Sequence, residues 1–142
     1  MIQRFTLIVL LLIGTLITSC SQSPEEQIAL INGYWEIAKI ENNHGSSKEY
    51  SISQNIDFFE VNAQGKGIRK KVQPDIKGNF TTTNSSENIS VITKGNTVFL
   101  EYSTAYDIWK EEIINVSKEE LILRNADNFT YVYRRYEPLS IN

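Results

Sequence analysis

Few side chains in this sequence are of the kinds that catalyse reactions or hold metals. The chain of 142 residues contains one histidine and one cysteine, which is a poor supply of ligands for a transition metal. The histidine, His44, stands between Asn43 and Gly45, a composition typical of an exposed turn. Because no positioned base, nucleophile or metal cage is evident, we expect no enzymatic activity, no metal site and no cofactor.

Carboxylates occur as two adjacent pairs, Glu111-Glu112 and Glu119-Glu120. Adjacent residues of a strand point to opposite faces of its sheet, so adjacency alone does not create an acid–base dyad. We therefore expect both pairs to be solvated surface charge. The other acids considered, which match no recognisable hydrolase motif, are Asp57, Asp75 and Asp107.

The main basic cluster of the sequence is the run Lys66-Gly67-Ile68-Arg69-Lys70-Lys71. It could bind lipid headgroups or lipopolysaccharide phosphates, or it could protect an exposed edge strand from aggregation. Its cations alternate across both faces of the expected strand. We therefore favour the edge strand.

The single cysteine, Cys20, directly follows a segment with the properties of a secretory signal. Arg4 precedes an apolar and small-residue stretch from Phe5 to Ser19, in the order found in signal peptides. This stretch is shorter than the roughly 20 apolar residues that a membrane-spanning helix needs. We predict that residues 1–19 are a cleaved signal peptide, with cleavage between Ser19 and Cys20.

The segment Leu16-Ile17-Thr18-Ser19-Cys20 resembles the lipobox of bacterial lipoproteins. The resemblance implies that the Cys20 thiol becomes a thioether carrying diacylglycerol, and that acyl chains such as palmitate anchor the mature protein to a membrane. The alternatives are a secreted protein with a chance cysteine at this position, or a buried apolar cysteine. Since the chain has one cysteine, the mature protein forms no internal disulfide.

Residues 20–31 are predicted to be a lipidated N-terminus and tether, in which residues 24–31 could form a helical turn. The adjacent acids Glu25 and Glu26 resemble the export signal of surface lipoproteins in the Bacteroidota, and a solvated linker is the other interpretation. We expect a lipid-anchored protein of the outer membrane, on its periplasmic or cell-surface face. An outer-membrane protein is then a candidate partner.

The size and charge of the mature chain limit its class. Removal of residues 1–19 leaves 123 of the 142 residues, which suits one domain. The signal contains one charged residue, Arg4, so the net charge changes from −3 to −4. A mildly acidic chain disfavours nucleic acid as a partner.

The mature sequence is rich in Val, Ile, Tyr, Phe and Thr, with Gly and Asn at short intervals, which is typical of many short strands. Turn-forming residues occur at 42–45, 62–65, 94–96 and 125–128, and the polar stretch 81–88 is expected to be a loop. The predicted strands are 34–41, 51–61, 67–73, 77–82, 89–94, 97–103, 107–117, 120–125 and 129–136.

Short connections favour antiparallel pairing of successive strands. Val98, Leu100 and Tyr102 share one face of a strand, whereas the segment 56–61 changes phase midway. That change indicates a bulge or a strand with apolar contacts on both sides. We predict an all-β, antiparallel up-and-down barrel of about eight to nine strands over residues 32–137, followed by a tail at 138–142. A β-sandwich of the same strands is the alternative.

The segment Asn32-Gly33-Tyr34-Trp35, at the start of the first strand, resembles the Gly-X-Trp motif of lipocalins, and of lipocalin-like lipoproteins of the Bacteroidota in particular. The resemblance implies that Gly33 allows a close turn beneath the barrel and that Trp35 plugs its closed end. It also implies that an arginine of the last strand packs across the indole ring. Of the two candidates, Arg134 and Arg135, we favour Arg135.

The lipocalin resemblance implies a binding function. We expect a membrane-anchored protein that takes a small hydrophobic or amphiphilic ligand at the mouth of the barrel. A non-catalytic accessory or structural subunit of an outer-membrane complex is the alternative. The sequence does not identify ligand-binding residues.

Overall fold

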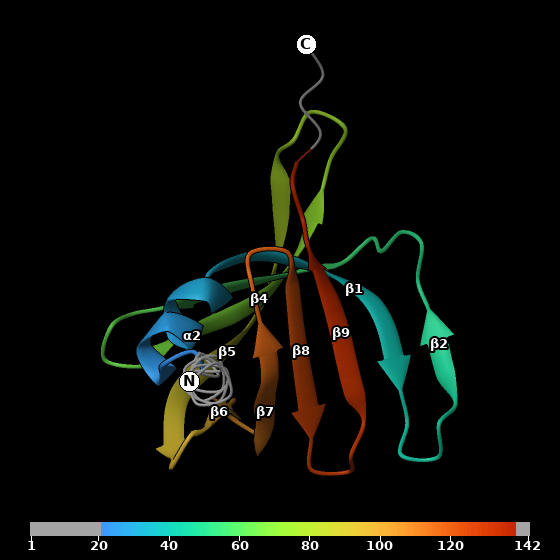
Figure 1. Ribbon diagram of the computed structural model, residues 1–142. Coiled ribbons are helices and arrows are strands. Elements are labelled where there is room, and N and C mark those ends of the chain that lie inside the picture. The colour runs from blue at the N-terminus through green and yellow to red at the C-terminus, as the bar shows by residue number, and fades with distance from the viewer. Residues whose placement is uncertain (1–20, 139–142) are drawn as a thin grey trace, which may run out of the picture.

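The computed structural model describes residues 21–138 and shows nine strands and one helix among them (Figure 1). In chain order these elements are α2 (Pro24–Ile31), β1 (Gly33–Glu41), β2 (Ser47–Glu49), β3 (Ile56–Val61), β4 (Lys66–Pro74), β5 (Phe80–Lys94), β6 (Thr97–Ser103), β7 (Ile108–Val116), β8 (Glu120–Asn125) and β9 (Thr130–Arg135).

The sheet closes into a barrel because β1 pairs along both of its edges. Strands β3 to β9 lie side by side in chain order, and β1 pairs with β3 on one edge and with β9 on the other. All of these pairings are antiparallel. The result is a closed eight-stranded up-and-down barrel, with β2 as an extra short strand beside the end of β1. The predicted barrel is confirmed, and the sandwich alternative is wrong.

Alternating apolar side chains fill the barrel. On β6, Val98, Leu100 and Tyr102 are all at most 1% exposed, which confirms the predicted shared face. On β3, Phe59 belongs to the same core, whereas Phe58 lies outside against Tyr34, with ring centroids 4.8 Å apart. Strand β3 pairs with β4 without a register shift, so the phase change reflects apolar contacts on both faces rather than a bulge.

Helix α2 belongs to the folded domain rather than to a tether. Ser23 and Glu26 form a capping box, in which each side chain accepts a hydrogen bond from the backbone N–H of the other. Pro24 stands in the first turn, where a backbone N–H would have no partner within the helix. At its other end, Ile31 is fully buried in the barrel core. The predicted tether 20–31 is therefore too long, because the folded part begins at Pro24 instead of Asn32.

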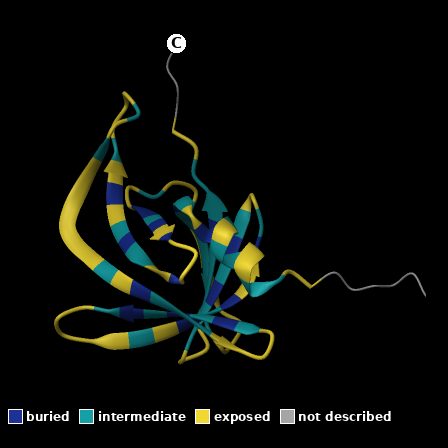
Figure 2. Cartoon of the chain, turned by 90° about the vertical axis from the view of Figure 1, so that its left-hand side faces the viewer, coloured by how far each residue is buried: buried dark blue, intermediate teal, exposed yellow. Residues whose placement is uncertain are grey.

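The polar stretch 81–88, expected to be a loop, lies within β5, which joins the predicted strands 77–82 and 89–94 into one. Most of this part of β5 is exposed (Figure 2). The paired ends of β4 and β5 project beyond the barrel (Figure 1). A strand segment that is exposed along most of its length needs no apolar alternation, which explains why the sequence pattern failed here.

The basic run 66–71 is not an edge strand. Strand β4, which contains it, is paired with β3 on one side and with β5 on the other. Its central arginine, Arg69, is 8% exposed and faces the interior. The edge-strand interpretation is therefore wrong, and these cations alternate between the outside of the barrel and its inside.

Among residues 21–138, no helix has the length and apolar character needed to cross a membrane. The predicted signal peptide 1–19 and Cys20 lie outside the described residues, as do residues 139–142 of the predicted tail.

Candidate ligand-binding site

Trp35 and Arg135 build the closed end of the barrel beneath α2. Trp35 is fully buried, and its Nε1 donates a hydrogen bond to the carbonyl of Ile31 over 2.6 Å. The guanidinium carbon of Arg135 lies 3.7 Å from the centroid of the Trp35 ring. Gly33 adopts a φ of +119°, and a Cβ there would lie 2.9 Å from Arg135 Nη1. A glycine is therefore the residue that lets the chain pass under the arginine.

Arg135 also satisfies carbonyl groups that the end of α2 leaves free. Its Nη2 donates to the carbonyl of Leu30 over 2.9 Å and its Nη1 to that of Asn32 over 2.8 Å. Its Nε donates to the carbonyl of Lys118, in the turn between β7 and β8, over 2.8 Å. Arg134, the other candidate, instead donates to Glu36 over 2.8 Å.

The interior of the barrel changes from apolar to polar with distance from this closed end. On β3, Val61 lies nearest the closed end, and Phe59 and then Asp57 follow on the same face. On β7, Ile113 is followed by Glu111 and Trp109 in the same direction. A layer of charged and aromatic side chains therefore lies above a packed apolar layer, towards the open end.

Arg69 is the centre of this layer. Its Nε is bonded to Glu87 of the neighbouring β5, and its Nη1 donates to Glu111 Oε2 over 3.5 Å across the barrel. Its guanidinium carbon lies 4.2 Å from the centroid of the Tyr102 ring. Arg69 and Glu111 are 8% and 7% exposed, so this network is desolvated.

A second ion pair lies in the same layer. Lys71 Nζ is 2.8 Å from Asp57 Oδ1, and Asp57 is 5% exposed. We define the interior polar layer as these paired groups together with Tyr102. Its members are Asp57, Arg69, Lys71, Glu87, Tyr102 and Glu111.

The hydroxyl group of Tyr102 is buried beside the Glu111 carboxylate, without a hydrogen bond of good geometry within the described residues. Tyr102 is fully buried and stacks on Trp109, with ring centroids 5.4 Å apart. Burial of a hydroxyl without a partner costs about 1–3 kcal/mol. The Tyr102 hydroxyl is therefore a poorly satisfied polar group inside the charged layer.

Burial shifts the acidity of the groups in this layer. Burial raises the pKa of the Glu111 carboxyl group, and the positive charge of Arg69 opposes that shift. Burial also raises the pKa of the Tyr102 hydroxyl, and the nearby Glu111 raises it further. For Tyr133, burial and then the charge of Asp57 raise the pKa. Both tyrosines are neutral at physiological pH.

Aromatic side chains form a wall above the polar layer. Trp109 and Tyr131 are half-buried and pack against the core from interior-facing positions. Phe129, two residues before Tyr131, is 38% exposed in the turn between β8 and β9. The open end of the barrel therefore presents accessible rings directly above buried charges.

The structure places the other sequence candidates apart from this layer or at its edge. Glu111, expected on the solvated surface, is buried and ion-paired, so that expectation is wrong. Glu112 lies on the outer face of β7, and Asp75 and His44 are exposed in turns. Sequence reasoning missed Arg69 as an interior residue. Its place four residues into an alternating strand was an available signal, but the register of the sheet was needed to use it.

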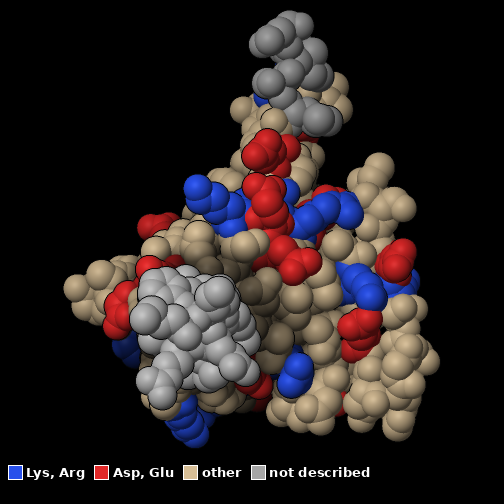
Figure 3. Space-filling view, viewed as in Figure 1, with Lys and Arg blue, Asp and Glu red and all other residues tan. Residues whose placement is uncertain are grey.

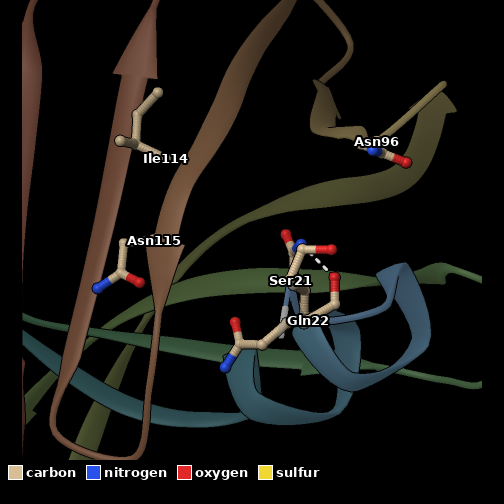
Figure 4. Close-up of a pocket in the computed structure, with 6 residues that line it drawn as sticks. Ser21, Gln22, Asn96, Ile114 and Asn115 are labelled. Atoms are coloured by element: carbon tan, nitrogen blue, oxygen red, sulfur yellow. Dashed lines mark hydrogen bonds between the residues drawn. The ribbon is translucent and has the colours of Figure 1, made fainter. Parts of the chain in front are cut away.

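A shallow hollow of about 400 Å³ lies on the outer surface beside the start of α2, lined by polar groups and Ile114 (Figure 4). Its labelled residues come from the N-terminal segment, from the turn before β6 and from β7. On the face shown in Figure 3, acidic and basic side chains are interspersed. Within residues 21–138, no three His, Cys, Asp or Glu side chains are arranged to hold a metal ion.

A closed, eight-stranded, up-and-down antiparallel barrel is the architecture of the lipocalins, and the protein has a lipocalin-like fold. Among solved structures, the chain is similar to a lipocalin-like protein from Bacteroides uniformis. The two share 12% sequence identity with a TM-score of 0.48, over 75% of this chain and 98% of that chain. No protein-family model matches the sequence, and no curated protein matches it significantly.

Proposed function

We propose that this protein is a membrane-anchored binding protein whose open barrel end takes a small amphiphilic ligand. The observation that carries the proposal is the interior polar layer beneath the aromatic wall of Trp109 and Tyr131. Replacement of a buried ion pair by packed apolar side chains is often neutral or stabilising. Charges that were only filling a core would therefore give no advantage to the fold, whereas a ligand with a polar group would use them.

The test is to isolate the protein from its membrane, extract it with organic solvent and identify what is released by mass spectrometry. We expect a stoichiometric amphiphile from the native protein and much less of it from Trp109→Ala. Phe99→Ala is the matched control, because Phe99 lies on the outer face of the neighbouring β6. An empty barrel that co-purifies with a stoichiometric protein partner would contradict the proposal and favour an accessory subunit.

We further propose that the anchor is a lipid on Cys20. Three residues separate Cys20 from Pro24, the first residue of α2, and an extended segment of that length spans about 10 Å. A lipid at Cys20 would hold the α2 side of the barrel beside the bilayer. Because α2 covers the closed end, ligand would enter from the opposite end.

Metabolic labelling with radioactive palmitate tests the anchor. The wild-type protein should carry label and sediment with membranes, whereas Cys20→Ser should lose the label and most of its membrane association. Ser21→Ala, next in the sequence, serves as the control and should behave as wild type. Membrane retention of the Cys20→Ser protein would contradict lipid anchoring.

A further inference from the structure

We infer that the ligand is a cationic amphiphile that enters head first, with its ammonium group against Glu111 and the Tyr102 hydroxyl and its chain directed to the open end. This inference rests on the proposed binding function and specifies the class of ligand. Four observations carry it: the charge of the interior polar layer, the engagement of Arg69, the free hydroxyl of Tyr102 and the order of polarity along the barrel.

The interior polar layer contains more acidic groups than basic groups. Three carboxylates, those of Asp57, Glu87 and Glu111, accompany two cations, the buried Arg69 and Lys71, whose side chain is 52% exposed and reaches in to Asp57. With all five ionised, the layer carries one uncompensated negative charge. Buried charge is stable only when it is paired, so a ligand with one positive charge would balance the layer and a carboxylate ligand would increase the imbalance.

Arg69 is already engaged by two carboxylates and an aromatic ring, which would compete with an anionic ligand for it. Glu87 and Glu111 engage its Nε and Nη1, and the ring of Tyr102 covers its plane. A fatty-acid carboxylate that approached the guanidinium would meet both of these glutamates. The interior arginine therefore organises the carboxylates instead of attracting a negative head group.

Two oxygen atoms remain to receive hydrogen bonds from a ligand. Glu111 reaches Arg69 through Oε2 alone, and within residues 21–138 its Oε1 forms no hydrogen bond. The Tyr102 hydroxyl is buried next to this carboxylate and forms no hydrogen bond of good geometry within the same residues. An ammonium group has several donors and no acceptor, which suits this pair of oxygens.

The order of polarity along the barrel sets the orientation of the ligand. Beneath the polar layer, Phe59 and Leu100 are fully buried and Ile113 is 6% exposed. These packed side chains fill the space below the layer, so the alkyl chain of a ligand cannot point towards the closed end. Beyond Glu111 towards the open end lie the rings of Trp109, which stacks on Tyr102, and Tyr131. An indole ring is the best aromatic partner for a cation, and the rings near the mouth also contact the chain. The head group is therefore the deepest part of the ligand.

The test uses residues 21–142, which include every residue of the described barrel and α2. Decylammonium, decanoate and decanol, which share one alkyl chain, are titrated by calorimetry at pH 7 and below their aggregation concentrations. We expect decylammonium to bind at least about tenfold more tightly than decanoate. Glu111→Gln should lower the affinity for decylammonium about tenfold or more and leave decanol nearly unchanged. Glu112→Gln, on the outer face, should change none of the three.

A second variant keeps the test decisive if Glu111→Gln does not fold. Tyr102→Phe removes a hydroxyl that forms no hydrogen bond of good geometry within the described residues, so the fold should persist while the affinity for decylammonium falls several-fold. Decanoate binding as tightly as decylammonium, or equal effects of Glu111→Gln and Glu112→Gln, would overturn the cationic ligand. Failure of all three compounds to bind would instead contradict the proposed function itself.

Discussion

Arg69 and Glu111 decide the character of the barrel interior, because they place paired charges where a simple barrel would place apolar side chains. Arg69 lies on β4 opposite Phe59, and Glu111 lies on β7 opposite Leu100. Both partners belong to the packed core. The charged groups therefore border the core directly, and their ionisation is coupled to folding.

The pH dependence of stability tests this coupling at Glu111. Burial raises its pKa above the ordinary value of 4.5, against the charge of Arg69. The folded protein thus binds this proton more tightly than the unfolded chain does. The resulting stabilisation is present below pH 4.5 and is lost as the pH rises through the raised pKa. The other charged groups nearby are Asp57 and Glu87.

We expect Glu111→Gln to remove the loss of stability that ionisation of Glu111 causes as the pH rises. The free energy of unfolding of the variant, relative to wild type, should therefore increase between pH 4.5 and neutral pH. Urea denaturation at several pH values measures the difference, and Glu112→Gln serves as the control. A difference that stays constant, or decreases, with rising pH would contradict the described burial of Glu111.

Arg135 joins three parts of the closed end through one side chain. Arg135→Ala removes hydrogen bonds to the carbonyls of Leu30, Asn32 and Lys118 and the contact with Trp35. We expect a loss of about 2–4 kcal/mol in the free energy of unfolding. Arg124→Ala, an outward-facing arginine on β8, should cost less than about 0.5 kcal/mol. Equal losses from the two variants would show that Arg135 has no special role.

At the level of elements, the projecting hairpin of β4 and β5 is held to the barrel by aromatic packing. Phe80 stacks on Tyr34 with ring centroids 4.4 Å apart and meets Tyr136 edge-on at 6.1 Å. We expect Phe80→Ala to increase amide hydrogen exchange at residues 75–82 about fivefold, because such a contact contributes about 1 kcal/mol. Exchange in β6 and β8 should not change.

Thr82→Ala is the control for this experiment, since Thr82 is an exposed residue of the same strand. Its exchange pattern should match that of wild type. Unchanged exchange at residues 75–82 in Phe80→Ala would show that the hairpin is held by other contacts.

Sequence patterns located most strands but failed where a strand has no single buried face. Strand β6 alternates cleanly because one of its faces meets the core, and its predicted and observed bounds agree. Strand β2 was missed because all three of its residues are exposed. The outer half of β5 was taken for a loop for the same reason. Alternation of apolar and polar residues arises when one face of a strand is buried, so strands exposed on both faces are hard to recognise from sequence.

At the level of the whole molecule, the closed barrel could be predicted from strand number, turn spacing and alternation, whereas the interior polar layer could not. Its central pair, Arg69 and Glu111, is separated by 42 positions in the chain. Only the registers of the intervening strands bring these residues together. The sequence showed a basic run and an acidic pair, and both resembled ordinary surface charge.

The two tryptophans of the chain lie at opposite ends of the barrel, so they report separately on where a ligand binds. Trp35 plugs the closed end, where its indole N–H is bonded to Ile31. Trp109 lies in the aromatic wall near the open end, stacked on Tyr102.

Nuclear magnetic resonance of the two indole N–H groups during titration with decylammonium therefore tests ligand binding at the open end most directly. We predict a saturable shift of the Trp109 signal and a constant Trp35 signal. A shift of the Trp35 signal alone, equal shifts of both signals, or no shift of either would contradict ligand binding at the open end.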